Sequence, residues 1–135
     1  MKISVFIILS SFIFFSACKP GPEKIDNMLN EASEKIRKSD NKGAIEELTK
    51  IIGYDKENYK AYYYRANAEF NLRQTKEAIA DYTKAIEIKP DYADAFFNRA
   101  SCKYYLNDTD GACNDWHKAF ELGKPNTGDM LNNCD

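Results

Sequence analysis

Small, aromatic and charged residues recur along this chain at an interval of 34 positions, and Ala44, Ala78 and Ala112 are the clearest example. Aligning 59–92 with 93–126 gives ten identical residues, and four further positions exchange one aromatic residue for another. A fixed period of this length indicates a repeat array, because a single unit cannot bury its own apolar face.

The same pattern predicts helices in pairs, separated by short polar or proline-containing breaks. The expected pairs are 25–38 with 42–53, 59–72 with 75–88, and 93–106 with 109–122. Lys89-Pro90 ends the second pair, since the residue before a proline is pushed out of the helical region. The fold class that follows is all-α. The polar tail after 123 is a poor helix candidate, so an irregular segment is expected to cap the last pair.

The repeated unit resembles the tetratricopeptide repeat (TPR), a 34-residue helix–turn–helix motif. The middle unit, 59–92, carries the matching residues Tyr62, Ala66, Ala78, Tyr82, Ala85 and Pro90. The last unit, 93–126, matches at Phe96, Ala100, Ala112, Trp116 and Ala119, whereas 25–58 is degenerate, with Met28 where an aromatic residue is usual. The resemblance implies an α-solenoid of about three TPR units, forming a right-handed superhelix with a concave ligand groove, followed by a C-terminal tail, 127–135.

Charged positions follow the repeat too. Arg65 and Arg99 share one position of the unit, and Asp81 and Asp115 share another. In an antiparallel helical hairpin these positions lie roughly opposite each other, so ion pairs within or between units are predicted. Partly exposed pairs of this kind contribute only about 0–1 kcal/mol, so their expected role is to orient the helices.

A different kind of segment precedes the array. Lys2 is followed by the largely apolar stretch Ile3–Phe15 and then by Ser16-Ala17-Cys18. A charged start, a short apolar stretch and small residues at its end are typical of a secretory signal. The cysteine resembles a bacterial lipoprotein box, which implies cleavage of a signal peptide, 1–17, and lipidation of Cys18. A plain signal peptide or an uncleaved anchor with an incidental cysteine remains the alternative.

Residues 18–24 would then form a lipidated tether, because Pro20, Gly21 and Pro22 are expected to prevent a helix there. The formal net charge of the whole sequence is −2. It contains no Lys/Arg cluster that would indicate nucleic-acid binding. A membrane partner is therefore expected only through the lipid.

Cysteine chemistry has several readings. A disulfide between Cys113 and Cys134 would tie the tail onto the last helix pair. The alternatives are a disulfide between Cys102 and Cys113, and no disulfide at all. Cys102, Cys113 and His117 lack the spacing of a structural zinc site. No metal, cofactor or catalytic residue is therefore assigned.

The TPR resemblance also implies which residues face the groove. Carried over by register, they are Tyr63, Asn67, Phe70, Asn71, Phe97, Ser101, Tyr104 and Tyr105. Rings interspersed with amides suit an extended peptide or a docked helix. Alternatively, a short array fills its groove with these rings or with its own tail. TPR proteins that grip an acidic chaperone tail use a carboxylate clamp of Lys and Asn, but Leu29 and Ser33 stand where that clamp begins.

These observations favour a non-catalytic, lipid-anchored TPR adaptor that binds a protein or peptide partner at the bacterial cell envelope, at the outer membrane or the periplasmic face. The alternatives are an assembly or biogenesis factor for outer-membrane or pilus machinery, and an accessory lipoprotein that binds glycan or cell wall. A thiol or metal-dependent enzyme would need Cys102, Cys113 and His117 to converge.

Overall fold

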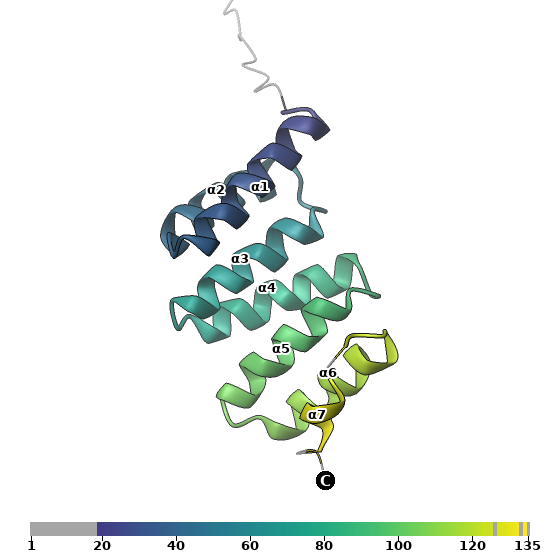
Figure 1. Ribbon diagram of the computed structural model, residues 1–135. Helices are drawn as coiled ribbons and strands as arrows, with labels where there is room; N and C mark the ends of the chain where they lie inside the picture. The colour runs from purple at the N-terminus through teal and green to yellow at the C-terminus, as the bar shows by residue number, and fades with distance from the viewer. Residues whose placement is uncertain (1–18, 126, 133, 135) are drawn as a thin grey trace, which may run out of the picture.

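The computed structural model describes residues 19–125, 127–132 and 134, and within them every regular element is a helix. The helices are α1 (Pro22–Arg37), α2 (Asn41–Tyr54), α3 (Tyr59–Asn71), α4 (Thr75–Ile88), α5 (Ala93–Tyr105), α6 (Thr109–Glu121) and α7 (Gly128–Leu131). Successive antiparallel pairs stack along one direction, from the N-terminal to the C-terminal end (Figure 1). The predicted all-α solenoid is confirmed.

The breaks inside the three pairs share one backbone conformation. Ser39, Arg73 and Asn107 follow the first helix of each pair with φ of 65°, 65° and 63°. They are 34 residues apart, although their side chains differ. The left-handed conformation costs a non-glycine residue roughly 1–2 kcal/mol, so packing of the two helices must hold each turn in place. The repeat is therefore conserved between units in backbone geometry as well as in residue type.

Helix α1 begins earlier than predicted, and this corrects the proposed extent of the tether. The expectation that the prolines exclude a helix before residue 25 is wrong, because α1 starts at Pro22. Proline is favoured in the first helical turn, where its missing N–H would have no partner within the helix and its φ is already helical. Of the described tether residues, only 19–21 remain outside the helix.

The core is a row of clusters rather than one central core. The first cluster combines residues of α1 and α2 with Ala61 and Ala68 of α3, and the second combines α3 and α4 with Ala95 and Cys102 of α5. Each unit thus completes its core with the first helix of the next unit, as expected for a linear array.

After the last pair, the tail replaces a following unit. Leu131 and Cys134 pack against the cluster of Ala100, Ala112 and Trp116. The tail is not irregular throughout as predicted, because residues 128–131 form the short helix α7, which lies against α6. Thr127, just before α7, is fully buried. Thr127 therefore belongs to the buried part of the cap, although the polar sequence around it suggests an exposed residue.

The repeated Arg–Asp pairs form within the units. The Arg65 guanidinium donates two hydrogen bonds to Asp81, at 2.6 and 2.9 Å, and Arg99 does the same to Asp115 at 2.8 and 2.7 Å. Asp81 and Asp115 are only 8% and 5% exposed. The pairs are therefore more buried than predicted, and removing one partner leaves a charge that water cannot reach well.

Candidate functional site: a neutral groove along the first helices

The first helices of the three pairs and Tyr82 of α4 enclose a cavity of about 380 Å³. Its lining residues are Ile36, Asn67, Phe70, Asn71, Tyr82, Asn98 and Ser101. None carries a formal charge. The cavity spans all three units, so the stacking of the array creates it and no single unit does.

Asn67 and Asn98 form the centre of a polar network in this groove. Asn98 Nδ2 donates to Asn67 Oδ1 at 3.0 Å and to the Tyr63 hydroxyl at 3.2 Å, and the Tyr82 hydroxyl also donates to Asn67 Oδ1. Burial raises the pKa of the Tyr82 hydroxyl, which keeps it a neutral donor. The network fixes both amides across the gap between α3 and α5.

The fixed amides retain capacity for a ligand. Within the described residues, no group donates to Asn98 Oδ1, and Asn67 Nδ2, which has two N–H groups, interacts only with the Tyr63 hydroxyl. Neither atom is buried without a partner. One donor and one acceptor therefore remain in the groove. Asn71 Nδ2 donates to Asn41 Oδ1 at 3.0 Å, and no described residue donates to the side-chain oxygen of Asn71. This set matches the N–H and C=O that each residue of an extended peptide presents.

Four of the eight residues assigned to the groove from the sequence line the cavity: Asn67, Phe70, Asn71 and Ser101. The other four, all aromatic, are not among the lining residues. Tyr63 packs among other rings, with its centroid 4.9 Å from that of Tyr92 and 5.9 Å from that of Tyr82. Phe97 belongs to the last core cluster, with Lys124 Nζ 5.6 Å from its ring centre.

Tyr104 and Tyr105 lie at the end of α5, and both are about half exposed. The Tyr104 ring lies 5.6 Å from that of Trp116, whereas Tyr105 packs edge-on against Phe70, 6.0 Å away. Tyr105 therefore borders the groove through Phe70, while Tyr104 covers the last unit.

Sequence reasoning missed Tyr82 and Asn98 as members of this site. Asn98 precedes Ser101 by three residues, so helical spacing alone could have placed it on the groove face. Tyr82 gave no such signal, because its ring is buried in the core and only its hydroxyl serves the groove.

Cys113 and Cys134 form a disulfide, with their Cα atoms 5.5 Å apart. Cys102 is buried and reduced, and burial raises the pKa of its thiol to about 12, which disfavours a reactive thiolate. His117 is exposed on α6. Within the described residues, no three potential metal ligands converge. The disulfide also means that Cys113 is not present as a free thiol beside Cys102 and His117.

The segment 1–17 and Cys18 lie outside the described residues. Among the helices of the described part of the chain, none has the length and apolar character needed to cross a membrane.

Comparison with known proteins identifies the repeat. Residues 59–92 match the sequence model of the tetratricopeptide repeat. No curated protein matches the chain. Among solved structures, the first TPR of Spaghetti (RPAP3), bound to the HSP90 peptide SRMEEVD, is 21% identical, with a TM-score of 0.80 over 87% of this chain and 94% of that one.

Two further structures illustrate the range of similar proteins. The TPR2B domain of yeast Sti1, in a complex with a pHsp70 peptide, is 24% identical, with a TM-score of 0.76 over 83% of this chain and 96% of that one. SycD, a type III secretion translocator chaperone of Yersinia enterocolitica, is 15% identical, with a TM-score of 0.78 over 83% of this chain and 90% of that one. Similarity at these identities establishes the TPR solenoid fold.

Proposed function

We propose that this protein is a non-catalytic adaptor that binds an extended segment of a protein partner in the groove between α1, α3 and α5. The observation that carries this proposal is the uncharged cavity in which fixed amides keep a donor and an acceptor free. Peptide complexes of similar solenoids support it, since both the RPAP3 and the Sti1 structures contain a bound peptide.

The partner segment we propose is neutral. An acidic peptide tail would need cations in the groove, and no lysine or arginine lines the cavity. Phe70 and Ile36 offer apolar contacts between the amides, so the segment should carry small apolar or amide side chains. This differs from the acidic peptide named in the RPAP3 complex.

The second part of the proposal is a lipid anchor on Cys18, which would hold the array at the bacterial cell envelope, at the outer membrane or the periplasmic face. Because α1 begins at Pro22, the residues 18–21 would span at most about 13 Å. The groove would therefore stay close to the membrane surface, within reach of partners that are themselves membrane-bound. Intact mass of the membrane fraction tests this part: acylated Cys18 supports it, and cleavage elsewhere without acylation contradicts it.

Site-specific crosslinking tests the groove. A photo-crosslinking amino acid at Asn71, which is exposed and lines the cavity, should capture the partner in cells. Ser101→Tyr should abolish the adduct, because the added ring fills the cavity. Lys118→Tyr adds the same ring at an exposed position of α6 and should leave the adduct intact.

Two results would contradict the groove proposal: an adduct that survives Ser101→Tyr in folded protein, or crosslinks scattered over several unrelated segments. If one segment is captured, its identity also distinguishes a general adaptor from an assembly factor. Both would bind a segment in the groove in the same way, but they would bind different partners.

A further inference from the structure

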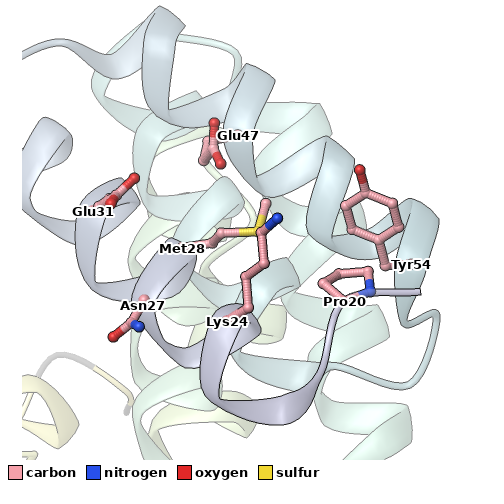
Figure 2. A pocket seen from close by; sticks show the side chains of 7 residues that line it. All are labelled: Pro20, Lys24, Asn27, Met28, Glu31, Glu47 and Tyr54. Atoms are coloured by element: carbon pink, nitrogen blue, oxygen red, sulfur yellow. The ribbon is translucent and has the colours of Figure 1, made fainter. Parts of the chain in front are cut away.

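A second cavity, of about 390 Å³, lies at the N-terminal edge of the array. Its lining residues are Pro20, Lys24, Asn27, Met28, Glu31, Glu47 and Tyr54, and Figure 2 shows them arranged between α1 and α2. The groove proposed above shares no residue with it.

The 34-residue register identifies what this cavity corresponds to in the other units. Glu31 occupies the position of Arg65 and Arg99, Glu47 that of Asp81 and Asp115, and Met28 that of Tyr62 and Phe96. In the second and third units this position holds a guanidinium. The first unit keeps the acidic partner and the apolar wall, but it has a second acid where the arginine would be.

The surroundings of the two arginines show what the position is built to hold. The Arg65 guanidinium pairs with Asp81 through two hydrogen bonds and lies 5.7 Å from the Tyr62 ring centre. Arg99 pairs with Asp115 in the same way and lies 5.5 Å from the Phe96 ring centre. Each arginine also donates to a threonine of the preceding unit, Thr49 or Thr83. A guanidinium is thus held by a carboxylate, a ring and the preceding unit.

The first unit has two carboxylates in this arrangement and no arginine. The cation that lines the cavity, Lys24, is exposed, and among the described residues it forms no ion pair with Glu31 or Glu47. Within the described residues, no cation lies at ion-pair distance from Glu31. Glu47 is paired only with Lys50, 3.6 Å away on its own helix, and the side chain of Glu47 is 16% exposed. Met28 and Tyr54 supply apolar surface to the lining, with Tyr54 on the opposite side of the cavity from Glu31 (Figure 2).

We propose that this cavity binds an arginine side chain of a protein partner, which takes the place that Arg65 and Arg99 occupy in their own units. Glu31 and Glu47 would receive the guanidinium, and Met28 and Tyr54 would pack along its aliphatic part and face. Lysine fits less well, because a compact ammonium cannot pair with two carboxylates through a planar fork.

The N-terminal edge of the array also indicates that the partner bound in this cavity is not another TPR unit of the same kind. Ala61 and Ala95 are fully buried where they meet the preceding unit, but their counterpart in the first unit is the exposed Asn27. An exposed amide in place of a buried alanine marks a terminal face. This inference does not rest on the groove proposal, and the two sites are tested separately.

Methyl NMR of the full-length protein in dodecylmaltoside tests the proposal, with the methionine methyl groups labelled. The probe is the capped tripeptide acetyl-Ala-Arg-Ala-amide, and its citrulline counterpart is the uncharged control. The Met28 methyl signal should shift saturably with the arginine peptide and not with the citrulline peptide, while the Met130 signal stays unchanged. Glu47→Gln should weaken binding by at least fivefold, whereas Glu46→Gln, a neighbouring exposed residue outside the cavity, should not.

Glu31→Arg provides the sharpest comparison. It restores the repeat pattern, so the new arginine should pair with Glu47, raise the melting temperature and abolish the Met28 response to the peptide. An equal response to arginine and citrulline would overturn the proposal. So would a Met28 shift that persists in folded Glu31→Arg, or a stronger response to phosphocholine, which would assign the cavity to a lipid headgroup.

Discussion

At the scale of single residues, the acidic side chains of α3 and α4 are stabilised by very few cations. Within the described residues, Arg65 is the only cation at ion-pair distance from Asp81, and it also lies 3.9 Å from Glu69. Asp115 has two cations, Arg99 at 2.7 Å and Lys103 at 2.8 Å. Loss of Arg65 would therefore leave Asp81 without a cation, whereas loss of Arg99 would leave Lys103 beside Asp115.

Arg65→Met should consequently be more destabilising than Arg99→Met. Removing one partner of a buried pair typically costs about 3–5 kcal/mol, and we expect Arg65→Met to fall near the lower end of that range. Arg99→Met should cost less, because Lys103 remains beside Asp115. Urea unfolding measures both, with Arg73→Met at an exposed position as the control. Equal losses in the two variants would show that Lys103 does not compensate.

Glu69 gives the chain a specific pH dependence. Burial, followed by the nearby charge of Asp81, raises the pKa of Glu69 from 4.5 to about 7. Between these values the unfolded chain releases the proton while the folded chain keeps it, so stability falls as pH rises from about 4.5 to 7 and then levels off.

Glu69→Gln should remove this dependence. Relative to the parent, the variant should gain on the order of 1–2 kcal/mol at pH 8, and the gain should be smaller at pH 5, because the shift is reduced by partial solvent access. Urea unfolding of both proteins at the two pH values measures the difference, in which the other titrating groups cancel. A gain that is the same at both values would contradict the raised pKa of Glu69.

At the scale of elements, the sequence was informative wherever local signals decide the structure. Helices α2 to α6 begin and end within one residue of their predicted bounds, because polar turns and Lys89-Pro90 mark them. The start of α1 was predicted too late, since Pro22 was read as a helix breaker when it occupies the first turn. Helix α7 carries no local signal, because four residues cannot form a helix alone and packing against α6 supports it.

The disulfide is the element-scale feature with the largest expected effect on the tail. Cys113 and Cys134 are 21 residues apart, and closing a loop of this size stabilises by roughly 3 kcal/mol in the chain-entropy model. Cys134→Ser should lower the free energy of unfolding by about that amount and allow chymotrypsin to cleave after Leu131, which packs against the last core cluster in the parent. Cys102→Ser, which leaves the disulfide intact, is the control. Unchanged proteolysis would mean that packing of Leu131 holds the tail without the disulfide.

At the scale of the whole molecule, the groove is a product of stacking, and this limited what the sequence could predict. Register identified the helix face that carries Asn67, Phe70, Asn71 and Ser101. It could not show that Tyr63 turns into the ring cluster with Tyr92, because that depends on how α3 and α5 pack. Half of the predicted groove residues therefore line the cavity. The other four pack mainly against neighbouring aromatic rings or the last core cluster.

The same dependence predicts that the array cannot be shortened from its C-terminal end by a whole unit. The second core cluster includes Ala95 and Cys102, so removal of 93–135 would expose the flank of α3 and α4, including the otherwise buried Tyr82. We expect the truncated protein to lose its cooperative urea transition and most of its helical circular dichroism, because neighbouring units supply much of the stability in such arrays.

The matched control ends at Pro125 and carries Cys113→Ser, so it keeps three helix pairs without the tail. It should still unfold cooperatively, although at lower urea than the full chain. A cooperative transition in the protein that lacks 93–135 would show that the first two units form an independent core. The third unit would then contribute α5 to the groove without being needed for the fold of the first two.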